Sequence, residues 1–321
     1  MIATYSTRLA ILCFASLFLI HLALGLLSLR LFPWFTRASR SMRPQAVSSI
    51  SIFMRLAPAG LSILFVIAVC IPSYLRYEGS STTEEIGLLC LVPACLGFLI
   101  CLIAVTRSAH AVVQSVLLTR KLCPGEISGP WCLNRETEEF PSMALVGLFK
   151  SKIVVSPLVL KTLTVEQFQA ALDHEQAHRS SADNLKRLLI LLCPDLFPFT
   201  RSFRAIENLW ERSAELSADD RATRGQNGRS IALAEALIKL ARLERSQTPP
   251  LLVSGLFAAP DGLTLRVERL VQQRDPPAEI RPFSGVLTWL ELSLLLLASV
   301  LLLPHLQILQ GVYRLLESLL R

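Results

Sequence analysis

Long apolar runs constrain this chain of 321 residues more than any other feature of its sequence. Four runs, at residues 9–29, 59–75, 87–105 and 286–303, approach the roughly 20 residues that a helix needs to cross about 30 Å of hydrocarbon. With 52% hydrophobic and only 18% charged residues, the chain is also too apolar for an ordinary soluble enzyme. The sequence therefore predicts a membrane protein with four transmembrane helices.

The first run has a second interpretation, a cleaved signal peptide. Its apolar stretch is longer than the roughly 7 to 15 residues of a signal peptide, and its basic cluster follows the run instead of preceding it. We therefore expect an anchor that stays. The second run is the shortest and contains Pro72, which a membrane helix tolerates near its end.

Positive charge is distributed unequally between the loops. The connection between the first two runs contains five arginines and no acidic residue: Arg30, Arg37, Arg40, Arg43 and Arg55. By the positive-inside rule this connection faces the cytoplasm. We therefore expect a multi-pass protein of the inner (cytoplasmic) membrane, with its N-terminus outside. Much of the net charge of +7 lies in this loop, so anionic lipid headgroups are the expected partner and direct nucleic acid binding is not expected.

These runs divide the chain into four parts. Residues 1–106 form a membrane region with three transmembrane helices, 107–285 a cytoplasmic domain, 286–304 the fourth transmembrane helix and 305–321 a short outer tail. The domain is large enough for its own core, and its pattern is α+β and mostly α. Two short apolar runs at 143–146 and 152–155, separated by Gly147, predict a small sheet or hairpin. Its edge either binds an extended peptide or simply covers the helices behind it.

Helix signals follow the predicted strands. Thr164 and Gln167 form a capping-box pattern at the start of a helix that runs beyond His178. Further helices are predicted at about 202–223, 230–244 and 263–272, and the third membrane helix is expected to continue to residue 122. The apolar run at 188–199 is too short to cross a bilayer and contains prolines, which favours an interfacial or re-entrant segment, or a buried core helix.

The eight cysteines contain no CxxC pattern and no paired spacing, and five of them fall inside the apolar runs. This favours small buried thiols in a reducing context over disulfides or a metal cluster.

Residues 174–178 read HEQAH, an HExxH motif within a predicted helix. Side chains at i and i+4 share one helix face, so His174 and His178 can reach one metal ion, and Glu175 can reach a water bound to it. Zinc takes neutral nitrogen ligands and lowers the pKa of its water toward about 7, while a carboxylate accepts the proton. The alternative is a solvated, charged helix face.

A catalytic zinc ion needs a third protein ligand and one open position. The remaining histidines lie in membrane or tail segments or far away in sequence, so a carboxylate is expected. Glu207, Glu211 and Glu215 follow one another at i+4 spacing on one helical face, and spacing alone does not choose among them. Glu215 has Asp219 one turn further on, positioned to orient a ligating histidine, whereas Glu211 followed by Glu215 is the competing pair.

HEQAH followed by ELSAD resembles the HExxH and ExxxD motifs of gluzincins. With the four-helix layout, the chain resembles the integral-membrane peptidases typified by BlaR and MecR (peptidase family M56), and ELSAD also matches the E-x-x-A-D form of family M48. The resemblance implies one zinc ion per chain, bound by His174, His178 and Glu215, with Glu175 as the base and Asp219 orienting a histidine. It extends more weakly to GLFKSKIVVS, Asp183 and LRVERL.

The sequence departs from that family in two respects. The chain ends soon after Pro304, so we expect no penicillin-binding sensor domain, and a separate sensor would be a partner protein. All tyrosines lie outside the predicted domain, so zinc itself or an arginine such as Arg179 or Arg221 is left to stabilise an oxyanion.

The resulting hypothesis is a zinc-dependent endopeptidase that acts on a protein or peptide at the cytoplasmic membrane face. The M56 resemblance implies regulatory cleavage of a repressor or signalling protein, and the M48 resemblance implies quality control of membrane proteins. The rivals are an inactive regulatory membrane scaffold and a structural zinc site. Intact candidate ligands and an intact base disfavour the scaffold, and an open coordination position disfavours the structural site.

Overall fold

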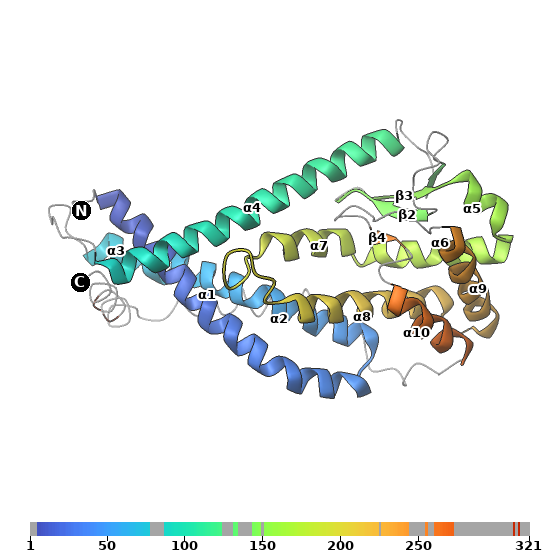
Figure 1. The fold of residues 1–321 in the computed structure, drawn as a ribbon, viewed down its shortest axis with the longest axis horizontal. Helices are drawn as coiled ribbons and strands as arrows, with labels where there is room; N and C mark the ends of the chain where they lie inside the picture. The colour runs from blue at the N-terminus through green and yellow to red at the C-terminus, as the bar shows by residue number, and fades with distance from the viewer. Residues whose placement is uncertain are drawn as a thin grey trace.

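The structure, a computed structural model, describes residues 5–77, 87–123, 131–133, 143–148, 151–224, 226–243, 254–255 and 260–272, together with Gly311 and Arg314. Within these residues the protein is mostly helical with one small sheet, as the sequence predicted. The molecule is elongated (Figure 1): α3 and the starts of α1 and α4 form one end, and the sheet with α6, α9 and α10 forms the other.

The helices begin and end as follows: α1 Tyr5–Ala38, α2 Pro44–Phe65, α3 Ile71–Tyr77, α4 Leu88–Leu122, α5 Pro157–Thr162, α6 Val165–Ser180, α7 Asp183–Leu192, α8 Arg204–Thr223, α9 Asn227–Leu243 and α10 Pro260–Val271. A 3-10 turn, Ser39–Ser41, follows α1, and a π-helical turn, Val66–Cys70, joins α2 to α3. The strands are β1 Trp131–Leu133, β2 Met143–Val146, β3 Lys152–Val155 and β4 Ser254–Gly255.

Three helical stretches are long and apolar enough to cross a membrane: Tyr5–Ser41, Pro44–Tyr77 and Leu88–Leu122. They contain the first three predicted spans, and α4 continues to Leu122 as expected. All three are longer than their apolar runs because their polar ends go on to pack against the rest of the protein. The predicted fourth span, 286–303, lies outside the described residues.

The membrane helices approach each other closely through small residues. A Cβ atom added to Gly97 of α4 would clash with the backbone carbonyl oxygen of Phe14 in α1, so only glycine allows this crossing. In the second span the π-helical turn comes just before Pro72. Proline cannot donate a hydrogen bond to the carbonyl four residues earlier, and the wider turn accommodates that loss without ending the span.

The second and third membrane helices are joined to the domain by direct packing. α2 lies along α8, and α4 lies along α7 (Figure 1). Arg55 of α2 is 1% exposed and donates to Glu207 Oε1 of α8 at 2.7 Å. Its guanidinium also donates to the carbonyl oxygen of Ile190 in the last turn of α7 at 3.1 Å. Just after α7, it donates to the carbonyl oxygens of Cys193 at 2.8 Å and Pro194 at 3.3 Å. A buried charge therefore ties the membrane region to two helices of the domain.

The apolar run at 188–199 divides into two parts. Its first part belongs to α7, which ends at Leu192, and residues 193–203 have no helical structure. This connection packs against α1: Leu196 is 3% exposed and fills the space that a side chain at Gly25 would need. Phe197 meets Phe18 edge to face with ring centroids 6.3 Å apart. Residues 193–203 therefore lie against α1, one of the candidate membrane spans.

The predicted hairpin is confirmed. β2 pairs antiparallel with β3, and the sheet order is β1-β3-β2-β4. Gly147, directly after β2, has a φ of 92°, a conformation that favours glycine. β2 is not an edge strand, because Ser254 and Gly255 of β4 pair with Leu145 and Ala144.

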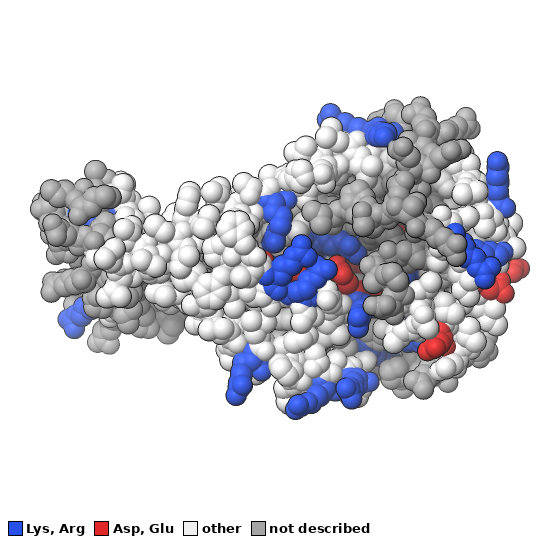
Figure 2. Space-filling model, in the orientation of Figure 1, with Lys and Arg blue, Asp and Glu red and all other residues white. Residues whose placement is uncertain are grey.

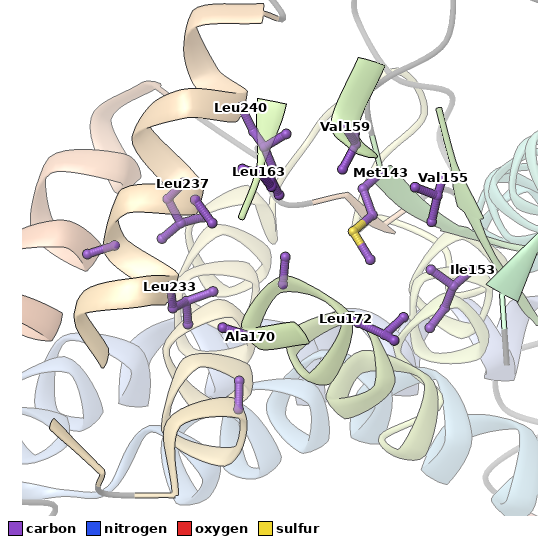
Figure 3. Close-up of a cluster of buried hydrophobic side chains, with 14 of the residues drawn as sticks. Met143, Ile153, Val155, Val159, Leu163, Ala170, Leu172, Leu233, Leu237 and Leu240 are labelled. Carbon is purple, nitrogen blue, oxygen red and sulfur yellow. The ribbon is translucent and has the colours of Figure 1, made fainter. Parts of the chain in front are cut away.

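The main core lies between this sheet and two helices. Figure 3 shows Met143, Ile153 and Val155 of the sheet facing Ala170 and Leu172 of α6, with Leu233, Leu237 and Leu240 of α9 closing the cluster. The predicted capping box is present at the start of α6: the Gln167 backbone N–H donates to the Thr164 hydroxyl, and the Thr164 N–H donates to Gln167 Oε1. The core and this cap fix the helix that carries HEQAH.

One prediction about the cysteines is wrong. Cys123, at the end of α4, and Cys132, in β1, form a disulfide with Cα atoms 6.5 Å apart, whereas the sequence indicated free thiols. The pairing depends on where β1 packs beside the end of α4, and the nine-residue separation in sequence carries no such signal. The five cysteines in the apolar runs, together with Cys193, are free as expected.

Candidate metal centre

Two helices bring the predicted ligands together. α6 supplies His174 and His178 one turn apart, and α8, which packs beside it, supplies Glu215. The three side chains are buried, and one ligand atom from each lies within 4.8 Å of the others. This group could hold a metal ion.

The spacing of the three atoms fits a small tetrahedral ion. The two Nε2 atoms of His174 and His178 lie 3.1 Å apart. Glu215 Oε2 lies 3.5 Å from the His174 nitrogen, and Glu215 Oε1 lies 3.5 Å from the His178 nitrogen. Zinc–nitrogen distances of about 2.0 to 2.1 Å place tetrahedral ligand atoms about 3.3 Å apart. Two imidazole nitrogens and one carboxylate would supply three of the four ligands of a tetrahedral ion.

A carboxylate lies close to the Nδ1 atom of each imidazole ring. Nδ1 of His174 lies 3.0 Å from Asp219 Oδ1, and Nδ1 of His178 lies 2.7 Å from Asp183 Oδ2. A carboxylate at Nδ1 favours the tautomer that leaves Nε2 free to bind a metal. The role that the resemblance implied for Asp219 has a matching position, and Asp183 provides a second such contact.

The buried side chain of Glu175 has no hydrogen-bonding partner among the described residues. It is 0% exposed, and neither carboxyl oxygen is bonded. Burial raises the pKa of Glu175 to about 7, against the opposing effect of the nearby histidines. A buried carboxylate without a partner is costly, and a metal-bound water is the kind of partner that this position would suit.

The metal-free centre binds protons differently from isolated side chains. Burial alone would lower the pKa of His178, but the carboxylates of Glu215 and Asp183 outweigh it and raise the pKa to about 10. Burial would raise the pKa of Glu215, but His178 and Arg266 hold it well below its usual range. His178 is therefore protonated at neutral pH without a metal, so a bound metal must displace its proton.

Arg266 of α10 is the residue at the centre that sequence reasoning missed. It is 5% exposed, and its Nε and Nη2 atoms donate to the two carboxylate oxygens of Asp219, both at 2.8 Å. Its Nη1 lies 2.9 Å from Glu215 Oε2. The only signal was its place in LRVERL, which the family resemblance covered without assigning a role.

The other predicted candidates lie elsewhere. Glu207, one of the three glutamates on α8, pairs with Arg55, and Glu211 is not part of the ligand group. Arg179 is exposed, and Arg221 donates to the Ser217 carbonyl and the Ser180 hydroxyl. The structure therefore groups Glu215, and not Glu211, with the two histidines, and it has Arg266, instead of Arg179 or Arg221, beside them.

Neither the protein-family models nor the curated proteins contain a match to this sequence. The class defined by the fold and the site is a helical protein with three helices apolar enough to cross a membrane and a buried His-His-Glu group that could hold a metal ion.

Proposed function

We propose that the protein is an integral-membrane, zinc-dependent endopeptidase. The observation that carries this proposal is the buried group of His174, His178 and Glu215 with the unpartnered carboxylate of Glu175 on the same helix. Two imidazoles, one carboxylate and an open fourth position form the ligand set of catalytic zinc in peptidases, whereas structural zinc sites are closed by four protein ligands. The donor set and its spacing favour zinc over the oxygen-binding ions magnesium and calcium.

Each residue of the centre has a role in this proposal. Zinc, when bound, supplies a Lewis acid that polarises the peptide carbonyl and lowers the pKa of water. Glu175 accepts a proton from the attacking water at its carboxylate and delivers it to the leaving amine, for which a pKa near neutrality is suitable. Asp219 and Asp183 hold the two imidazoles, and Arg266 holds the carboxylates of Asp219 and Glu215.

The proposed setting is the cytoplasmic side of the inner membrane. The turn between α1 and α2, which contains Arg40 and Arg43, is at the same end of the molecule as α10 (Figure 1). The positive-inside rule therefore places the domain in the cytoplasm. The disulfide Cys123–Cys132 favours the opposite orientation, because disulfides persist in oxidising compartments.

Labelling with a membrane-impermeant maleimide separates the two orientations. Lys161 is exposed on α5, so a Lys161→Cys variant offers a thiol on the domain surface. We expect labelling only after the cells are opened. Labelling of intact cells would place the domain outside and reverse the orientation.

Proteolysis by the full-length protein in detergent tests the function itself. We expect wild type to cleave an unstructured protein such as casein, and a chelator to stop the cleavage. Glu175→Gln should abolish cleavage and retain the metal, because the residue is a base and not a ligand. Glu211→Gln, one turn before Glu215 on α8, is the matched control and should remain active. Cleavage by Glu175→Gln at the wild-type rate would refute the peptidase proposal and favour a membrane scaffold.

A further inference from the structure

A cavity lies beside the candidate span α4, and none of the residues of the candidate metal centre lines it. Its volume is about 170 Å³, several times the roughly 30 Å³ that one water molecule occupies in the liquid. Residues of α4 form one wall, and the connection between α7 and α8 forms the other. The α4 wall is itself part of a candidate span. The other wall packs against α1, another candidate span, through Leu196 and Phe197.

The polarity of the cavity changes along the axis of α4. Ile100 and Ile103 belong to the apolar part of α4, which contains no charged residue before Arg107. The opposite wall contributes Phe197 and Phe199, 44% and 89% exposed. The cavity is therefore apolar on the side toward the membrane interior, and it becomes charged at the level where α4 stops being apolar.

The charged side of the cavity has an excess of positive charge. Arg107 and Arg201 line it against one carboxylate, Asp195. Arg107 Nη2 donates to the Leu191 carbonyl at 2.9 Å and Nη1 lies 3.6 Å from Asp195 Oδ2, whereas its Nε is buried without a hydrogen bond. Arg201 is exposed and has no ion pair with any residue that the structure describes. Two guanidinium groups against one carboxylate leave a site that favours an anion.

The surface of the molecule also divides into an uncharged part and a charged part. In Figure 2, basic side chains gather near the middle of the molecule, where the narrow, uncharged part meets the wider domain. Such a boundary is where headgroups begin in a bilayer, and Arg side chains at this depth bind lipid phosphates.

We propose that this cavity binds one anionic glycerophospholipid, with its phosphate at Arg107 and Arg201 and an acyl chain along Ile100, Ile103 and Phe197. The ligand chemistry follows from the change in polarity along the cavity: an apolar chain suits the end at Ile100 and Ile103, and a phosphodiester suits the two guanidinium groups at the other end. The site joins α7, which begins with Asp183, to α8, which carries Glu215. It is independent of the proposed peptidase activity.

Native mass spectrometry of the full-length protein in non-ionic detergent tests this site without any activity assay. The probes are phosphatidylglycerol, phosphatidylcholine with the same acyl chains, and inorganic phosphate. We expect one phosphatidylglycerol per chain to bind more tightly than phosphatidylcholine, and no adduct with inorganic phosphate. Equal affinity for the two lipids would show a purely apolar groove, and saturation by inorganic phosphate alone would show a site for a free anion. Either result would overturn the proposal.

Two variants and a control locate the bound lipid. Arg201→Gln should weaken phosphatidylglycerol binding about tenfold, which corresponds to about 1.4 kcal/mol. Ile103→Trp fills the apolar side and should reduce binding without changing the charge. Arg204→Gln is the matched control, because Arg204 is also exposed but does not line the cavity, and its affinity should stay within about twofold of wild type. Equal losses for Arg201→Gln and Arg204→Gln would contradict the assignment, and unchanged melting temperatures exclude misfolding as the cause.

Discussion

Replacing Arg55 with methionine is expected to weaken the contact between α2 and the helices that support the candidate metal centre. The guanidinium is 1% exposed and donates to Glu207 at 2.7 Å and to three carbonyl oxygens of the α7 end. It also stacks over the Phe203 ring, 4.7 Å from the centroid. Methionine preserves much of the apolar contact and removes every one of these donors.

The size of the effect follows from what is left behind. Removing one partner of a buried ion pair costs about 3 to 5 kcal/mol, because the other charge remains uncompensated. Glu207 is 22% exposed and recovers some hydration, so we expect the lower end, about 3 kcal/mol. Glu207→Gln leaves Arg55 bonded to the carbonyls, and it should cost only about 1.5 kcal/mol, the lower limit for a hydrogen bond to a charged group.

The free energy of unfolding of the full chain in detergent, followed by tryptophan fluorescence during denaturant titration, measures this loss. Trp210 lies in α8 and is 2% exposed, so its emission reports on the contact. Arg40→Met is the control, because Arg40 is exposed and its replacement should change stability by less than about 0.5 kcal/mol. A loss below about 1 kcal/mol for Arg55→Met, or an equal loss for Arg40→Met, would refute the reasoning.

Three further perturbations have defined outcomes. Gly97→Ala should cost about 1 to 3 kcal/mol in the same unfolding assay because its Cβ meets the Phe14 carbonyl, whereas Gly60→Ala, with no atom within 4 Å, should not destabilise the protein. Asp183→Asn should weaken metal affinity about 10- to 100-fold in a chelator competition, because His178 loses the carboxylate that orients it. The rate of peptide cleavage should fall on the acid side of neutrality as Glu175 becomes protonated. Its pKa of about 7 in the metal-free chain is lowered by a cation bound nearby, so the midpoint measured in a pH profile should lie below 7, and a midpoint above 7 would contradict this assignment.

Local patterns in the sequence predicted the parts of the site that lie on single helices. His174, Glu175 and His178 were placed correctly because i and i+4 positions share a face once the Thr164 cap fixes the helix. Glu207, Glu211 and Glu215 have equivalent spacing, so choosing among them required either the family resemblance or the packing of α8 against α6. The first three apolar runs likewise predicted three long apolar helices but not their ends.

Contacts between different elements of the fold could not be predicted in this way. Asp183 reaches His178 because the chain reverses at Ser181 and Ala182, where Ala182 has a φ of 53° that is unusual for alanine. Arg266 lies 47 residues from Asp219 in sequence, and its ion pairs depend on how α10 packs beside α8. The disulfide Cys123–Cys132 and the contact of Leu196 with Gly25 depend in the same way on tertiary packing.

The metal content of the purified protein, measured by inductively coupled plasma mass spectrometry, tests the central claim most directly. We expect about one zinc ion per chain for wild type and for Glu211→Ala, and little or none for Glu215→Ala, because only Glu215 completes the ligand set with His174 and His178. Wild type without zinc after growth and purification in its presence, or a Glu215→Ala variant that retains the full amount, would contradict the account.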